Sequence, residues 1–217
     1  MPRRPPEPSS RLTAAEVGEL LGVSRETLDR LQTYLDLLVR WQKAINLVGP
    51  ATLADPWRRH VLDSGQLRRS WPKDARRLVD LGSGAGLPGL VLAILGVPEV
   101  HLIESDRRKA AFLREAARAC GAAVTVHAAR IEEVPPLMAD VVTARALAPL
   151  TDLLGLAERH LQPRGVCLFL KGRTVETELT SARESWTMCL HREASLSDSE
   201  SQVLIISEIR RAASQSV

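Results

Sequence analysis

The sequence predicts an α/β fold in which a mainly parallel sheet carries helices on both faces. From residue 77 onward, short apolar runs rich in Val, Leu and Ile alternate with helical segments, as in parallel strands joined by crossover helices. The first run breaks into glycines at 82, 84, 86 and 89 and restarts as a helix, which places backbone N–H groups at one point in space. The last two runs have only a polar turn between them, so they should pair as an antiparallel hairpin at the sheet edge.

Residues 12–76 are expected to form a small helical unit in front of this sheet. Thr13-Ala14-Ala15-Glu16 matches a capping box, and Gly22 marks the end of the helix that it opens. Ser24 caps a longer helix that runs to about Asn46, with an apolar stripe at helical spacing. A third helix is expected from Asp55-Pro56-Trp57 to Leu67. The predicted disordered tails are residues 1–11 and 212–217.

The main domain is expected to span residues 77–211. A sheet of this kind that ends in an antiparallel hairpin is the arrangement of Rossmann-like class I S-adenosylmethionine-dependent methyltransferases. The expected strands are 77–82, 99–105, 123–128, 139–144, 165–170, 187–195 and 201–210, and the expected helices are 87–96, 107–120 and 150–161.

Composition indicates a globular cytoplasmic protein. The chain has 217 residues, 45% hydrophobic and 25% charged, which suits one sizeable domain with a small appendage. No apolar run approaches the roughly 18 residues of a membrane span, and the basic amino terminus has no apolar segment behind it, so it does not resemble a secretory signal. Cys120, Cys167 and Cys189 are far apart and odd in number, so they are expected to be buried thiols, without disulfides or a metal site.

The net charge of +3 is unevenly distributed along the chain. Residues 1–77 hold 14 basic and 9 acidic side chains, whereas residues 78–217 hold 15 basic and 17 acidic ones. The basic surplus therefore lies before the glycine segment, where an anionic partner such as nucleic acid could be held. A solvated surface is the alternative explanation.

The glycine segment is compatible with two cofactors, and its spacing favours S-adenosylmethionine. A dinucleotide site needs G-x-G-x-x-G, but the third glycine position is Leu87. Asp80 precedes the loop, where its negative charge would repel a pyrophosphate and suit a cofactor with an ammonium and a sulfonium. The next strand ends in Glu104, 22 positions after Gly82, where a carboxylate can accept hydrogen bonds from ribose hydroxyls.

Two kinds of methyl-acceptor atom are disfavoured because the sequence lacks the catalytic motifs that they need. Methylation of cytosine C5 needs a thiolate, usually in Pro-Cys, but the three cysteines follow alanine, valine and methionine. Methylation of exocyclic amines commonly uses Asp/Asn-Pro-Pro-aromatic after the fourth strand, which here ends VVTARALAP. An acceptor with an exposed lone pair, such as guanine N7, needs no general base and remains open.

Four segments together resemble the RsmG family, also called glucose-inhibited division protein B. They are HVLDSGQL (60–67), VDLGSGAGLPG (79–89), TARALAPL (143–150) and LFLKGR (168–173), and the similarity extends over about residues 25–210. The resemblance implies a cytoplasmic, monomeric S-adenosylmethionine-dependent methyltransferase that modifies N7 of one guanosine in 16S rRNA. Its substrate is either free 16S rRNA or the assembled small ribosomal subunit. The resemblance implies neither a metal nor a membrane.

The resemblance also implies roles for individual residues. Glu104 stands where the family often has aspartate, and Ile131-Glu132 matches a pair beside the adenine. Arg145 matches an arginine at the cofactor pocket, with a structural salt bridge as the alternative, and Lys171 is a candidate for contact with RNA phosphate. Arg145 and Lys171 are candidate substrate-positioning residues. The expected cofactor-binding residues are Gly82, Gly84, Gly86, Leu87, Glu104, Ile131, Glu132 and Arg145.

Other functions are not excluded by the sequence. The enzyme could methylate another RNA nucleotide. A nicotinamide-dependent oxidoreductase would need the third glycine of G-x-G-x-x-G and a hydride-transfer partner, and the sequence shows neither. A non-catalytic RNA-binding module would explain the basic helical unit but not the glycine loop. A hydrolytic triad of His60, Asp63 and Ser64 is not expected, because a nucleophile elbow is absent. These residues are expected to cap and anchor the helical unit, and contact with the substrate is the alternative. Trp41 is expected to lie in the core. Trp57 and Trp71 could stack on bases, but an aromatic content of 3% favours packing for them too.

Overall fold

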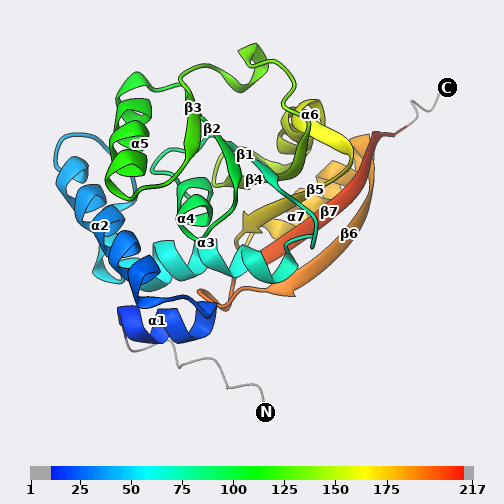
Figure 1. Cartoon of the computed structure of the whole chain (residues 1–217). Helices are drawn as coiled ribbons and strands as arrows, with labels where there is room; N and C mark the ends of the chain where they lie inside the picture. Colours follow the sequence, from blue (N-terminus) through cyan, green and yellow to red (C-terminus); the bar gives the residue numbers. More distant parts are fainter. Residues whose placement is uncertain (1–10, 213–217) are drawn as a thin grey trace.

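The strands predicted from residue 77 onward are present in the computed structural model, which describes residues 11–212. Within that range they form one seven-stranded sheet with the order β3-β2-β1-β4-β5-β7-β6 (Figure 1). Neighbours among the first five strands pair in parallel, and β7 is antiparallel to both β5 and β6, so the fold class and the edge hairpin are confirmed. The strands are β1 (Arg77–Leu81), β2 (Glu99–Ile103), β3 (Val124–His127), β4 (Ala139–Arg145), β5 (Leu161–Lys171), β6 (Trp186–Ala194) and β7 (Gln202–Arg211).

The sheet is buried on both faces because its strands carry apolar side chains at successive positions. In β5, Leu168 and Leu170 belong to the core on one face, and Cys167 and Phe169 to the core on the other. Helices α4 and α5 pack over the first face, with α2 packed against both of them, and α6 and α7 pack over the second. The helices of the main domain are α4 (Gly89–Ile94), α5 (Arg107–Ala119), α6 (Leu150–His160) and α7 (Val175–Ser185).

The amino-terminal helices form as their capping residues predict. Thr13 and Glu16 close a reciprocal capping box at α1 (Ala14–Leu21), and Gly22 ends this helix in the left-handed conformation, with φ 63°. Ser24 caps α2 (Arg25–Gln42), which ends four residues before the expected Asn46. The third helical segment has a π-helical turn (Trp57–Leu62), a short α3 (Asp63–Gly65) and a 3₁₀ turn (Gln66–Ser70).

The helical unit packs directly on the sheet domain. Tyr34 of α2 is fully buried, lies near Phe112 of α5, and donates a hydrogen bond of 2.8 Å to the carbonyl of Ala85 in the glycine loop. Trp41 packs edge-on against Phe112, and Trp57 is buried, as expected for packing residues. The unit therefore shares its core with the main domain and helps to fix the glycine loop.

Two elements and one cysteine differ from the sequence prediction. Strand β5 begins at Leu161, which had been assigned to the preceding helix, and helix α7 was not predicted. Cys120 and Cys167 are buried as expected, but Cys189 is exposed, because it lies on the edge strand β6 with its thiol directed to Glu208. No helix within residues 11–212 is long and apolar enough to cross a membrane. The predicted tails lie almost wholly outside the described residues.

Candidate functional site

A cleft of about 1060 Å³ lies where β1, β2, β4 and β5 end. This is the edge of an open α/β sheet at which ligands bind, and the volume is at the upper end of that of small-molecule pockets. The turns after these strands line it, together with part of the helical unit between residues 47 and 63. The cleft brings together most of the predicted site residues, namely Gly82, Gly84, Leu87, Glu104, Ile131, Glu132, Arg145 and Lys171.

The three glycines of the loop after β1 share one backbone requirement and differ in what surrounds them. Their φ values are all positive, 62° at Gly82, 53° at Gly84 and 83° at Gly86, which favours glycine. A Cβ on Gly84 would project into open space, with only a backbone oxygen at 3.8 Å, so this is the position at which a side chain would fill the cleft. A Cβ on Gly82 would come within 2.5 Å of Leu147, and one on Gly86 within 2.7 Å of Leu90. Gly86 is therefore needed for packing as well as for the turn, and it does not line the cleft.

Glu104 follows β2 and holds the glycine loop through its carboxylate. The side chain accepts a 2.8 Å hydrogen bond from the backbone N–H of Gly84 and a 2.7 Å bond from that of Asp106. Glu104 is only 7% exposed, yet it lines the cleft. A carboxylate has about four acceptor sites, so two remain for the hydroxyls of a ribose. This geometry fits the nucleoside part of S-adenosylmethionine.

The segment after β3 supplies another wall of the cleft. Ile131 and Glu132 lie in a 3₁₀ turn (Ile131–Glu133), with the Ile131 side chain buried and Glu132 exposed. Leu87, in the glycine loop, is also buried and lines the cleft. An apolar residue beside a polar one suits a purine, whose faces are apolar and whose edge forms hydrogen bonds.

Asp80 has a different role from the expected one. It is completely buried and does not line the cleft, so it does not present its charge to a ligand there. Its carboxylate accepts hydrogen bonds from the hydroxyl of Thr143 at 2.7 Å and from the backbone N–H of Gly89 at 3.2 Å. Burial raises the pKa of Asp80 from 3.8 to about 6, and the hydrogen bonds oppose this rise. Asp80 thus fastens the loop between β1 and α4 to β4.

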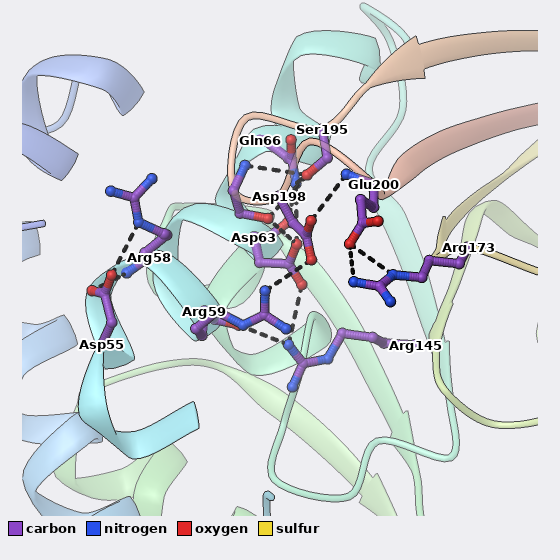
Figure 2. A network of polar contacts seen from close by, with 11 residues as sticks. Asp55, Arg58, Arg59, Asp63, Gln66, Arg145, Arg173, Ser195, Asp198 and Glu200 are labelled. Carbon is purple, nitrogen blue, oxygen red and sulfur yellow. Dashed lines mark hydrogen bonds and ion pairs between the residues drawn. The ribbon is translucent and has the colours of Figure 1, made fainter. Parts of the chain in front are cut away.

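Arg145, at the end of β4, joins the helical unit to the sheet edge (Figure 2). Its Nη1 donates to Asp63 Oδ2 at 3.1 Å and to the carbonyl of Arg59 at 3.0 Å. The Arg145 and Asp63 side chains are 22% and 15% exposed, so this ion pair is partly shielded from solvent. The salt bridge that was the alternative for Arg145 is thus present, and the same side chain also lines the cleft.

Lys171, at the end of β5, is held by an acidic residue of the unpredicted helix. Its Nζ donates to Glu178 at 2.6 Å and to the carbonyl of Ala148 at 2.9 Å, and the residue is only 9% exposed. Glu178 also accepts from the backbone N–H of Leu150 at 2.9 Å, where α6 begins. These bonds fix the turn between β4 and α6, in which Ala146 has a positive φ of 51°.

His60 lines the cleft, but it is a weak base. The residue is 1% exposed, and Nε2 lies 3.2 Å from the hydroxyl of Thr52. Burial, with the positive charges of Arg145 and Arg59, lowers the pKa of His60 to about 3. Ser64, the third member of the rejected triad, is fully buried, which agrees with an anchoring role for this group.

Several residues of the site were not identified from the sequence. Asp198 and Ser201, in the turn between β6 and β7, line the cleft 50 or more residues after Arg145. Glu178 lies on α7, whose buried positions Val175, Leu179 and Ala182 have the spacing of an apolar helix face. That spacing could have predicted the helix, but no local pattern indicates the partners of Glu178.

Comparison with known proteins identifies the family. The sequence profile of the GidB family, described as rRNA small subunit methyltransferase G, matches residues 27–205. The chain belongs to the GidB family. A relative from Rhodospirillum centenum, named ribosomal RNA small subunit methyltransferase G, is 59% identical over 206 residues, which cover 95% of this chain and 94% of the relative. A GidB relative of the same name from Paramagnetospirillum magneticum is 60% identical over 194 residues, 89% of this chain and 95% of its own.

Solved structures with low sequence identity to this chain share its fold. A structure described as a SAM-dependent methyltransferase from Aquifex aeolicus superposes with a TM-score of 0.55 at 15% identity, over 72% of this chain and 94% of the other. This likeness confirms the predicted Rossmann-like methyltransferase fold. Membership of the GidB family confirms the resemblance inferred from the four motifs and makes the chain an rRNA methyltransferase.

Proposed function

We propose that this GidB-family enzyme transfers a methyl group from S-adenosylmethionine to N7 of a guanosine in the 16S rRNA of the small ribosomal subunit. The observation that carries the proposal is the state of the acidic groups in the cleft. Of the described carboxylates that line it, all but Glu132 are held by a cation or by backbone N–H groups. These held carboxylates are Asp63, Glu104, Glu178 and Asp198.

The held carboxylates are poor general bases, because a proton taken up by one of them would disrupt its hydrogen bonds or ion pair. His60 is neutral and lines the cleft, but it is almost completely buried and its low pKa makes it a weak base. Guanine N7 carries a lone pair and no proton, so methylation at this atom requires no base. Alignment of acceptor and donor can by itself lower a barrier by about 7–11 kcal/mol. The cleft is thus suited to an acceptor that can attack unaided.

The cofactor would lie against the glycine loop. S-adenosylmethionine supplies an electrophilic methyl group on a sulfonium. In the proposed arrangement Glu104 holds the ribose hydroxyls, Ile131 and Glu132 adjoin the adenine, and the backbone around Gly82 and Gly84 allows close approach. Gly86 contributes through the backbone turn, which needs its positive φ, and through packing.

The remaining residues position the acceptor. Arg145 and Lys171 both fix the turn after β4, which lies beside the cleft. Arg145 does so by binding Asp63 of the helical unit, and Lys171 by binding Glu178. Because Lys171 uses its charge on Glu178, we assign it a positioning role in place of the expected phosphate contact. The basic helical unit would contact RNA, and the enzyme would act as a cytoplasmic monomer.

The test is methyl transfer followed by nucleoside analysis. The purified chain is incubated with labelled S-adenosylmethionine and with 16S rRNA, or intact small subunits, from cells that lack this enzyme. The expected product after digestion is 7-methylguanosine from a single position. Another methylated nucleoside would contradict the assignment to N7, and no incorporation into either substrate would contradict the proposed function.

A further inference from the structure

Two carboxylates in the turn between β6 and β7 hold arginines that come from two different parts of the chain (Figure 2). Asp198 accepts a hydrogen bond of 3.0 Å from Arg59, which lies in the π-helical turn of the helical unit and lines the cleft. Glu200 binds Arg173 through both Nε and Nη2, and Arg173 follows β5 between two residues that line the cleft, Gly172 and Thr174. The turn therefore neutralises cationic groups at the mouth of the cleft.

The turn is held in place independently of these ion pairs. The backbone N–H of Leu196 and the hydroxyl of Ser195 both bind the side-chain amide of Gln66, and the hydroxyl of Ser197 donates to Asp63. A further backbone bond joins the N–H of Ser195 to the carbonyl of Ser201 at 3.1 Å. Neutralising Asp198 or Glu200 should thus leave the turn where it is.

The two ion pairs are also exposed, and hence easily exchanged. The side chains of Arg59 and Asp198 are 42% and 28% exposed, and those of Arg173 and Glu200 are 78% and 51% exposed. Exposed pairs contribute little to stability. A guanidinium binds phosphate with the same planar geometry with which it binds carboxylate. A phosphate can therefore replace either carboxylate at little cost to the fold.

We propose that Arg59 and Arg173 bind phosphates of the RNA strand that enters the cleft, and that Asp198 and Glu200 occupy these arginines until RNA displaces them. This inference rests on the proposed function, because it takes rRNA as the substrate. Arg58 is excluded, although it precedes Arg59, because it is only 9% exposed and forms an ion pair with Asp55. The proposed phosphate contacts thus lie on the helical unit and, across the cleft, just after β5.

The experiment compares Asp198→Asn, Glu200→Gln and the double variant with the unaltered chain. Asparagine keeps an oxygen that can accept the N–H of Glu200, so the turn retains its cap. Glu99→Gln is the matched control, because Glu99 forms a similarly exposed pair with Arg77 where β1 and β2 begin, at the opposite edge of the sheet. Glu99→Gln raises the net charge of the protein by one, as each test variant does, so it measures the general effect of net charge on RNA binding.

RNA affinity is measured by filter binding at fixed salt, with 16S rRNA and with small subunits from cells lacking the enzyme. Each single variant is expected to bind about two- to fivefold more tightly than the Glu99→Gln control, the range that a weak exposed ion pair implies. Arg59→Gln and Arg173→Gln should each weaken binding and reduce the slope of log affinity against log salt by about 0.7–0.9. Calorimetry with S-adenosylmethionine should give the same affinity for Glu200→Gln as for the unaltered chain.

Two results would overturn the inference. If Asp198→Asn and Glu200→Gln bind RNA no more tightly than Glu99→Gln, the carboxylates brace the turn and do not compete with phosphate. If Arg59→Gln and Arg173→Gln keep the full salt slope, the arginines make no phosphate contact. Methyl incorporation by the unaltered chain separates these results from failure of the proposed function. An unaltered chain that neither binds nor methylates rRNA would overturn both.

Discussion

The buried carboxylate of Asp80 makes the stability of the protein depend on pH in a direction that can be measured. Asp80 is 0% exposed, and burial raises its pKa from 3.8 to about 6. The folded state therefore binds a proton more tightly than the unfolded state does. Above pH 6 the group is ionised in both states, and its burial destabilises the fold. As the pH falls from about 6 towards 3.8, proton uptake by the folded state relieves this cost.

The magnitude follows from the size of the shift. Each pKa unit corresponds to 1.36 kcal/mol, so a shift of about two units is equivalent to about 3 kcal/mol. Between pH 7.5 and pH 4 the unaltered chain should recover about 2–3 kcal/mol of this from Asp80 alone. Other titrating groups also change the stability over this interval. They cancel when the unaltered chain is compared with Asp80→Asn, which has nothing to titrate at this position.

The assay is urea unfolding of both proteins at several pH values, followed by tryptophan fluorescence. The free energy of unfolding of the unaltered chain minus that of Asp80→Asn is expected to rise by about 2–3 kcal/mol from pH 7.5 to pH 4. Thr143→Val is a second variant: it removes the hydroxyl that stabilises the ionised form, so it should raise the pKa of Asp80 further. A difference that stays constant across this pH range, or that falls as the pH falls, would refute the reasoning.

Three further predictions concern the cleft. Glu104→Gln should weaken binding of S-adenosylmethionine by about 10- to 100-fold in calorimetry, because charge-assisted hydrogen bonds of about 1.5–3 kcal/mol are lost; an unchanged affinity would remove the carboxylate from the ribose site. Arg145→Ala should reduce methylation at least tenfold and lower the free energy of unfolding by about 1–3 kcal/mol, since Asp63 loses its cation; wild-type activity would show that Arg145 has only a structural role. Glu178→Gln should lower kcat for methylation more than it lowers cofactor affinity, because Lys171 and the turn after β4 lose their anchor, and an unchanged kcat would contradict this positioning role.

The fold was predictable because its signals are local. The capping residues Thr13 and Ser24 determine where α1 and α2 begin, and the apolar runs from residue 77 onward determine the strands. The start of β5 was misplaced because Pro163 and Gly165, which are typical of turns, lie inside the strand, where its pairing with β4 is irregular. Helix α7 was missed although its apolar positions are periodic, since its sequence is otherwise polar.

The site was predictable where it depends on strand ends, and not where it depends on tertiary contacts. Gly82, Gly84 and Glu104 follow strands, and the parallel sheet brings such positions to one edge. Asp63, the partner of Arg145, comes from a distant segment, and no sequence pattern connects the two. Glu178 is close to Lys171 in sequence, but it lies on the helix that was not predicted. Gly86 shows a limit of motif reading, because a glycine within a ligand-binding motif can be required by the packing beneath it.

The central claim is that the methyl donor binds at the carboxyl ends of the strands, against the glycine loop. A crystal structure of the chain with S-adenosylhomocysteine tests it most directly. We expect the ribose hydroxyls within hydrogen-bond distance of Glu104, the adenine beside Ile131, and the sulfur facing the part of the cleft next to Arg145. Density for the ligand elsewhere on the protein, or a ribose without contact to Glu104, would contradict this account.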